Sequence, residues 1–399
     1  MQALNISDRI KAMAASATLA MSQKSNELRA QGVDVINLSV GEPDFDTPEH
    51  IKEAAKRAID DNFTHYPPVP GYMELRKAIS RKLQEENGVT FAPEQVVVSA
   101  GAKHSLSNVI YVLINPGDEV IIPTPAWVSY VEMVKLAGGV NILVPSGIEE
   151  DFKITPERLE AAITPRTRMV LLCSPSNPSG SVYTRSELQG LVNVLAKYPQ
   201  IAILSDEIYE HINYGKEFVS LASFPEVAGR VVVVNGVSKV YAMTGWRIGF
   251  MAGPIEVAKA VTKLQGQTTS GISTIAQKAA IAAYDGPQQC VTDMCEAFRR
   301  RRDLVVSLAR KIPGLKVNEP QGAFYLFPEV SAYLGKEYNG RRIETDGDLA
   351  MYLLEEAHVA TVSGSAFCLP GYIRLSYAAA DHLLTEAFER IGQALAKLA

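Results

Sequence analysis

A lysine and an arginine, Lys239 and Arg247, follow closely on four consecutive valines at 231–234. The valines predict a short strand that is buried on both faces. A lysine beside the end of a buried strand is costly unless its charge is neutralised, paired or used covalently. One interpretation is an amine held in a dry pocket as a Schiff-base nucleophile, with the guanidinium nearby to bind an anion. The other is a surface loop with two unrelated cations, and this stretch alone leaves both open.

An aspartate occupies the equivalent place on another apolar segment. Asp206 follows the segment 201–205, and Tyr209 lies three residues further along. A buried carboxylate needs a cationic or hydrogen-bonding partner. Beside a ligand with a ring nitrogen, Asp206 would keep that nitrogen protonated, so that the ring accepts electrons from a carbanion. An aspartate that caps a helix is the alternative.

Polar or aromatic groups follow three further strand-like segments. Gly101 and Ala102 stand at a strand-to-helix turn, where exposed backbone N–H groups can bind an anion, although many such turns contain a glycine. Asn177 lies between two prolines that fix its loop, and its amide could donate to a ligand oxygen or belong to an ordinary turn. Trp127 could stack on a planar ligand or form part of the core.

Apolar strand-like segments and helix-like segments alternate from about residue 90 to 285. This alternation predicts an α/β fold with a mostly parallel sheet sandwiched by helices. Ligands of such sheets bind at the carboxyl ends of the strands. The polar stretches that follow the strands are SAGAK, SPSNPSG, SDEIYE and NGVSK. Their common position predicts one shared site.

With 399 residues the chain is too long for one ordinary core, so we expect two domains. Residues 46–289 should form a large, ligand-binding domain. Residues 1–45 should form an N-terminal arm and part of a small domain, and residues 290–399 should complete this small α+β domain.

Composition excludes several classes of protein. The net charge of −5 argues against a nucleic-acid-binding or anionic membrane surface, and no apolar run is long enough to cross a bilayer. The N-terminus lacks the apolar core of a signal peptide, and four dispersed cysteines favour reduced thiols in a cytoplasmic protein. Six scattered histidines predict no metal site. The basic run 299–302 would point in four directions on a helix, which favours a solvated helix with some paired arginines over an RNA-binding patch.

A lysine, an aspartate, a tyrosine, an asparagine, an arginine and an anion-binding turn are together the parts that a pyridoxal phosphate site requires. The motifs SVGEPDFDTPEHI, YPPVPGYMELR, SPSNPSG, SDEIYE, SKVYAMTGWRIG and IRLSYA span essentially the whole chain. In these motifs the sequence resembles the class I aminotransferases of the aspartate aminotransferase family, which are fold type I pyridoxal-phosphate enzymes. The resemblance implies a seven-stranded sheet in the large domain.

The resemblance also implies roles around the cofactor ring. Lys239 would carry the covalent link to pyridoxal 5′-phosphate, and Asp206 would pair with the pyridinium nitrogen. Asn177 and Tyr209 would bond the 3-oxygen of the ring, and Trp127 would stack on its face.

For the cofactor phosphate, the resemblance implies Arg247 and the backbone at Gly101 and Ala102. Tyr66 would reach the phosphate of the neighbouring subunit, which implies an obligate homodimer with shared active sites. Many relatives have a phosphate-binding serine three residues before the lysine. Gly236 stands there in this chain, and whether Ser238 compensates is open.

On the substrate side, the resemblance implies that Arg374 clamps the α-carboxylate bidentately, as a planar guanidinium favours. Asn177 and the backbone at Gly41 would help. A distal carboxylate would be recognised by Lys103 and Thr18. The loop SGSAFC at 363–368 differs from the commoner PGxxFG, so substrate contacts there are open.

The expected reaction is a ping-pong transfer of an amino group between an amino acid, in the first place L-aspartate, and 2-oxoglutarate. Aromatic amino acids or prephenate are the alternative substrates within the family. Relatives that use prephenate often carry Lys-Pro where this chain has Ala14 and Ala15. A non-catalytic pyridoxal-phosphate sensor is the alternative from another class, and the absence of GxGxxG after any strand argues against a dinucleotide dehydrogenase.

Overall fold

Seven strands form the main sheet, in the order β2-β8-β7-β6-β5-β3-β4. The computed structural model describes residues 4–215 and 217–399. β3, β4, β5, β6 and β7 run parallel, whereas β8 pairs antiparallel with both β7 and β2. The predicted mostly parallel, seven-stranded sheet is confirmed. The strands of this sheet are β2 (Val96–Ser99), β3 (Glu119–Thr124), β4 (Val140–Pro145), β5 (Thr167–Cys173), β6 (Ala202–Asp206), β7 (Val231–Gly236) and β8 (Gly249–Ala252).

Helices cover both faces of the sheet, and the valines of its strands alternate between the two sides. Val231 and Val233 of β7 belong to the apolar cluster under one layer of helices, and Val232 and Val234 belong to the cluster under the other. The first layer contains α4 (Met73–Asn87), α8 (Arg185–Leu195) and α10 (Thr274–Asp285). The second contains α5 (Ala102–Leu113), α6 (Ser129–Leu136) and α9 (Ile255–Thr268). Strands buried on both faces need such uniformly apolar sequences.

A second, smaller body combines both ends of the chain. β1 (Ile36–Asn37) pairs parallel with β12 (Val359–Ala360). Strands β13 (Val362–Ser363), β14 (Ile373–Ser376) and β9 (Tyr325–Leu326) form an antiparallel sheet, and β10 (Glu337–Tyr338) pairs with β11 (Arg341–Arg342). Its helices are α2 (Ala17–Ala30), α12 (Asp346–Glu356) and α13 (Asp381–Leu395). We therefore propose two domains: a large domain of residues 46–289, and a small domain that combines residues 1–45 with residues 290–399.

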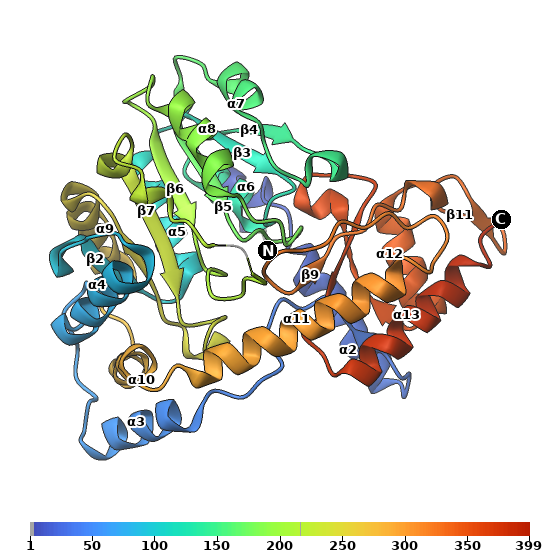
Figure 1. Cartoon of the computed structure of the whole chain (residues 1–399), viewed down its shortest axis with the longest axis horizontal. Coiled ribbons are helices and arrows are strands. Elements are labelled where there is room, and N and C mark those ends of the chain that lie inside the picture. The colour runs from blue at the N-terminus through green and yellow to red at the C-terminus, as the bar shows by residue number, and fades with distance from the viewer. Residues whose placement is uncertain (1–3, 216) are drawn as a thin grey trace.

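A short helix, α7 (Pro156–Ala162), adds Leu159 to the first layer. The remaining helices connect the two bodies or flank them: α1 (Asp8–Lys11), α3 (Glu49–Asp60) and α11 (Gln289–Ala309). Figure 1 shows α11 running from beside α10 toward α12 and α13. The basic run lies on α11, where Arg299 and Arg300 are exposed as expected. Arg301 and Arg302 are buried, so the prediction of solvent exposure was wrong for these two, whereas the predicted pairing of some arginines is confirmed. Arg301 turns inward to form a bidentate pair with Asp44, at 2.7 and 3.0 Å.

Among the described residues, no helix combines the length and the apolar character needed to span a membrane.

Candidate active site

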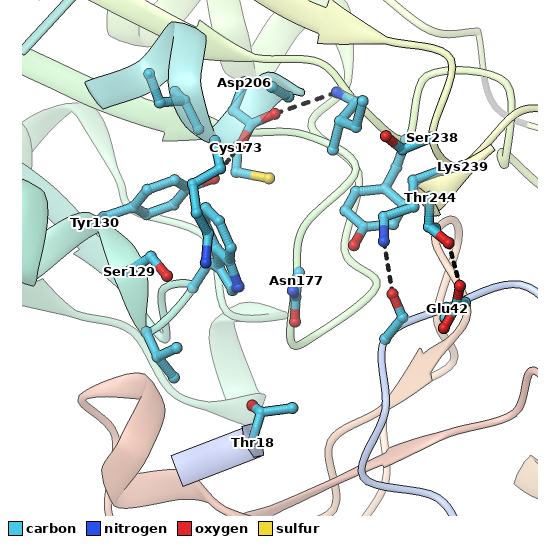
Figure 2. A pocket seen from close by; sticks show the side chains of 18 of the residues that line it. Thr18, Glu42, Ser129, Tyr130, Cys173, Asn177, Asp206, Ser238, Lys239 and Thr244 are labelled. Atoms are coloured by element: carbon cyan, nitrogen blue, oxygen red, sulfur yellow. Dashed lines mark hydrogen bonds between the residues drawn. The ribbon is translucent and has the colours of Figure 1, made fainter. Parts of the chain in front are cut away.

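A cavity of about 420 Å³ opens at the carboxyl ends of β5, β6 and β7, as expected for a sheet of this type. Residues from both bodies line it (Figure 2). Eleven of the thirteen predicted site residues are among its walls: Thr18, Gly41, Ala102, Lys103, Trp127, Asn177, Asp206, Tyr209, Lys239, Arg247 and Arg374. The other two, Gly101 and Tyr66, lie outside the lining.

Lys239 follows β7, and its Nζ donates a hydrogen bond to the carbonyl oxygen of Gly41 at 2.6 Å. Burial lowers the pKa of this amine to about 8; the Glu42 carboxylate opposes the shift, whereas Arg374 and Arg247 add to it. An amine with this pKa is partly neutral at physiological pH, and only a neutral amine is nucleophilic. The nucleophilic role of Lys239 stays a prediction, and the amine is chemically suited to it.

Asp206 is the last residue of β6, lies on the same side of the cavity as Tyr130 (Figure 2), and is 3% exposed. Burial raises the pKa of its carboxyl to about 6, against hydrogen bonds from the Tyr130 hydroxyl and the Ile208 backbone and the charge of Lys239. At neutral pH it is therefore mainly ionised. It is a buried anion to which a protonated ring nitrogen can bind.

The turn between β2 and α5 forms a cradle for an anion. Gly101 has φ +86°, which favours glycine, and a side chain there would collide with the guanidinium of Arg247. Arg247 Nη1 and Nη2 donate to the carbonyl oxygens of Thr244 and Ala100, at 2.8 and 3.2 Å. Gly249 lets the backbone at Ala102 pack directly against β8. The guanidinium and the N-terminus of α5 thereby face the same space.

The surroundings of Gly236 leave no space for the serine that the resemblance would lead one to expect at this position. A Cβ at this position would lie 2.7 Å from the carbonyl oxygen of Ile248 and 2.8 Å from Cα of Gly249. There is no room for a serine unless β8 moves. Ser238 instead is buried and lines the cavity.

Arg374 is 2% exposed, and its guanidinium lies between the rings of Tyr325 and Phe367, 4.6 and 4.9 Å from their centroids. It donates to Oδ1 of Asn177 at 3.0 Å and to the carbonyl oxygen of Ser39 at 2.5 Å. Its Nε has no hydrogen-bond partner within the described part of the chain. A buried guanidinium without a carboxylate partner is suited to bind the carboxylate of a ligand.

The remaining walls place aromatic and polar groups around the same space. Tyr209 shares a hydrogen bond of 2.8 Å with Tyr325 through their hydroxyls. Lys103 Nζ lies 4.8 Å from the ring centroid of Trp127. Burial and the nearby charge of Arg247 lower the pKa of Lys103. Thr18, in α2, lies on the side of the cavity opposite Asp206 (Figure 2).

The cavity holds more positive than negative charge. Lys103, Lys239, Arg247 and Arg374 line it, and none of them forms an ion pair with a described residue, whereas its acidic groups are Asp206 and Glu42. Arg374 is buried, Lys239 is half-buried, and Lys103 and Arg247 are exposed at the rim. A buried, unpaired cation such as Arg374 is costly unless a ligand completes it. The site is therefore built for a ligand, or two ligands, with several anionic groups.

The family model described as aminotransferase class I and II matches residues 33–391. The chain belongs to this aminotransferase family. It is 49% identical over 389 residues to the aspartate/prephenate aminotransferase of Cereibacter sphaeroides, with 97% of both chains covered. It is 47% identical to an aspartate aminotransferase of Rhizobium meliloti, over 98% of this chain and 96% of the relative.

Solved structures agree with this assignment. The crystal structure of the Rhizobium meliloti aspartate aminotransferase matches with a TM-score of 0.96 at 46% identity and covers all of both chains. The aspartate aminotransferase of Thermus thermophilus with maleate matches with a TM-score of 0.92 at 42% identity, over 98% of this chain and all of the other. The fold expected for this aminotransferase is thus confirmed.

Of the two predicted site residues outside the cavity lining of this aminotransferase, Gly101 is buried against Arg247, whereas Tyr66 is at the surface. Its side chain is 96% exposed, beside a surface groove formed by residues 64–67 and 271–274. Its expected contact with a neighbouring subunit stays a prediction, because the structure describes one chain.

Sequence reasoning missed several groups that line the aminotransferase site: Ser16, Leu19, Glu42, Ser129, Tyr130, Thr244 and Tyr325. Glu42 follows the predicted Gly41 directly and accepts a hydrogen bond from Thr244. Tyr130 lies one helical turn after Trp127, so periodicity could have found it. The unusual loop at 363–368 places Phe367 against Arg374, and Cys368 takes the left-handed conformation (φ 61°) that favours glycine.

Proposed function

We propose that this aminotransferase uses pyridoxal 5′-phosphate to transfer an amino group between L-aspartate and 2-oxoglutarate by a ping-pong mechanism. The observation that carries the proposal is the opposition of Lys239 and Asp206 across a cavity lined by three further unpaired cations. A sensor that does not turn over its ligand would not need a substrate clamp such as Arg374 beside the lysine.

The donor set fits the cofactor, which supplies an aldehyde that condenses with amines and a ring that accepts the electrons of a substrate carbanion. Lys239 would form the covalent link, and Asp206 would keep the ring nitrogen protonated. Arg247 and the α5 N-terminus, with Gly101 and Ala102, would hold the phosphate. The crowding around Gly236 supports Ser238 as a further phosphate ligand.

Around the ring, Trp127 would cover one face, and Asn177 and Tyr209 would donate to the 3-oxygen. Asn177 suits this role because its Oδ1 already accepts from Arg374, which leaves the Nδ2 hydrogens as donors. Once released by the incoming amine, Lys239 would be the base that takes the proton from the substrate Cα, and a pKa of about 8 matches that task. Within the same half-reaction Lys239 would deliver that proton to C4′ of the cofactor, and in the second half-reaction it would move a proton in the opposite direction.

Three observations support dicarboxylic substrates. Arg374 is ready for an α-carboxylate, with help from the backbone at Gly41. Lys103 and Thr18 stand at another wall and would receive a distal carboxylate. The relatives named above act on aspartate or on aspartate and prephenate, and the Thermus thermophilus structure holds maleate. Prephenate, which also carries two carboxylates, is therefore the second candidate as an acceptor.

The same proposal includes a homodimer with shared sites, in which Tyr66 of one subunit reaches the phosphate held by the other. The exposure of this tyrosine supports it. The four cysteines are free thiols, which supports a reducing, cytoplasmic environment.

Borohydride reduction followed by peptide mapping tests the proposal directly. The purified protein should be yellow, should lose its visible band on addition of aspartate, and should carry the reduced pyridoxyl group on Lys239. The variant Lys239→Ala should bind the cofactor without the covalent link and should lose transamination by at least about a thousandfold. A pyridoxyl group on another residue, or near-normal transamination by the variant, would refute the assignment.

A further inference from the structure

The carboxylate of Asp206 is held by two hydrogen bonds of unequal strength. The Tyr130 hydroxyl donates to Oδ2 at 2.5 Å, and the backbone N–H of Ile208 donates to Oδ1 at 3.3 Å. Within the described ranges, no ion pair or other hydrogen bond to this carboxylate is found. Short bonds from a hydroxyl to a carboxylate are the strong ones, so the phenol is the main anchor of Asp206.

One turn of helix joins this anchor to the aromatic wall of the cavity. Tyr130 is the second residue of α6, and its N–H donates to the carbonyl oxygen of Trp127 at 3.0 Å. The two rings meet edge to face, with centroids 5.4 Å apart and planes at 83°. Figure 2 shows Tyr130 and Asp206 together on one side of the cavity, away from Lys239. The turn therefore fixes the phenol behind the carboxylate and the indole beside the ligand space.

The groups around Asp206 determine whether the proton of this short hydrogen bond stays on the Tyr130 hydroxyl or moves to the carboxylate. Tyr130 is 2% exposed, and burial and the charge of Asp206 raise its pKa well above the ordinary value, so the phenol stays a donor. Burial likewise raises the pKa of Cys173, whose Sγ lies 3.3 Å from the carbonyl oxygen of Pro175, so it contributes no charge. Lys239 faces Asp206 from the far side of the cavity. Among these neighbours only Tyr130 touches the carboxylate.

We propose that Tyr130 is a positioning residue of the aminotransferase reaction, whose hydroxyl keeps Asp206 ionised and oriented toward the ring nitrogen of the cofactor. The inference rests on the proposed function, because it acts through the ring nitrogen of bound pyridoxal phosphate. Without the phenol, a buried carboxylate would lose its main donor and take up a proton more readily. A neutral Asp206 would no longer stabilise a protonated ring.

The first test compares the holoenzymes of the wild type, Tyr130→Phe and Tyr352→Phe. Tyr352 is a matched control, because it is 1% exposed and its hydroxyl donates to the carbonyl oxygen of Ala394 in the small domain. In Tyr130→Phe, kcat should fall about tenfold while KM for aspartate changes less than about twofold. The acid limb of the kcat profile should move to higher pH, and the pH titration of the visible band should change. Tyr352→Phe should match the wild type in all four measurements.

A second pair of variants, compared after the folded fraction of each has been measured by circular dichroism, tests whether the phenol acts through Asp206. Asp206→Asn and Asp206→Asn/Tyr130→Phe both lack the buried charge that the phenol serves. If Tyr130 acts through Asp206, the two should have the same kcat within about twofold and the same visible spectrum. A further loss of about tenfold in the double variant would overturn the proposal, as would wild-type kcat and spectrum in Tyr130→Phe.

Failure of this inference and failure of the proposed function give different results. If wild-type protein shows neither the visible band nor transamination, the proposed function falls and the inference with it. If the wild type is active and Tyr130→Phe is indistinguishable from it, the role of Tyr130 alone is refuted.

Discussion

Two groups of charges flank the end of β7, and only one of them consists of ion pairs between described residues of the protein. On one side, Glu210 accepts hydrogen bonds from Lys82, Asn87 and Asn235, the last at 2.7 Å, so every charge has a partner. On the other side, the cations around Lys239 and Arg374 have no carboxylate partner among the described residues. Arg374 in the second group is as deeply buried as Glu210 in the first, at 2% and 6% exposed. Within its described part, the fold therefore pairs the charges of the Glu210 cluster and leaves unpaired the cations that line the cavity, where we propose that the ligand binds.

This difference gives each group its own expected response to mutation. Removing one member of a paired, buried group leaves an uncompensated charge and destabilises the fold. Removing an unpaired cation relieves a cost that only the ligand offsets, so stability should be kept while function is lost. Measuring the free energy of unfolding and kcat/KM on the same variants separates the two.

Arg374→Met should produce the largest functional effect. The guanidinium is the group that we expect to clamp the substrate carboxylate, so kcat/KM for aspartate should fall by about a thousandfold or more. The urea midpoint should stay the same or rise, because the variant removes a buried charge that lacks a carboxylate partner. Arg374→Lys keeps the charge without the planar fork and should lose activity to an intermediate extent. A loss below tenfold would remove Arg374 from the clamp.

Lys82→Met should have the opposite effect: a large loss of stability with little change in activity. It leaves Glu210 buried without its cation, so we expect a loss of about 3–5 kcal/mol in the free energy of unfolding, measured by urea titration. The activity of the folded fraction should stay within about twofold of the wild type. The control is Lys82→Met/Glu210→Gln, which removes both charges and should recover much of the stability. Equal stability of Lys82→Met and the wild type would contradict the view that the ion pair of Lys82 and Glu210 stabilises the fold.

Lys103→Ser tests whether one cation of the cavity distinguishes dicarboxylic from aromatic substrates. Burial and Arg247 lower the pKa of Lys103, so its charge is most favourable when a distal carboxylate is bound beside it. We expect kcat/KM to fall about a hundredfold for aspartate and less than about threefold for an aromatic donor. Lys259→Ser, at an exposed position of α9, is the control and should change neither value. Equal losses for both donors would exclude a role in recognising the distal carboxylate.

The sequence predicted the part of the site that belongs to the strand ends. Lys239, Asp206 and Asn177 each follow an apolar run whose type and length are local properties, and parallel strands then bring their ends together. The seven-stranded sheet and the role of Arg374 depended on the likeness to known enzymes, because no local pattern pairs residues 177 and 374.

The ion-paired cluster of Glu210 and Lys82, and the aromatic residues that support the cavity, could not be predicted in this way. Glu210 meets Lys82 across 128 positions of sequence, and periodicity shows that each is on a buried face without showing the partner. The inward turn of Arg301 toward Asp44 was missed for the same reason. Gly236 was noticed as a departure, but its cause is the contact with β8, which only the three-dimensional structure provides.

The smallest expected effect concerns Glu207. This carboxylate is close to the ion pair of Glu210 and Lys82 but has no cationic partner of its own among the described residues. It is 2% exposed and accepts hydrogen bonds from the hydroxyls of Ser205 and Ser220 at 2.8 and 2.9 Å, whereas its Oε2 has no partner in the described ranges. Burial and the charge of Glu210 raise its pKa from 4.5 to about 8. The folded protein therefore binds this proton more tightly than the unfolded chain.

Stability from this proton is fully present below about pH 4.5 and is lost as the pH rises toward 8. Glu207→Gln keeps the shape of the side chain and does not titrate, so its stability relative to the wild type should increase between pH 6 and 8. We expect a gain of about 1–2 kcal/mol, measured as urea midpoints across that range. Glu85→Gln, at an exposed position of α4, should follow the wild type. Parallel pH curves for Glu207→Gln and the wild type would show that Glu207 is ionised in the folded protein, and the paired cluster would then have to accommodate a second negative charge.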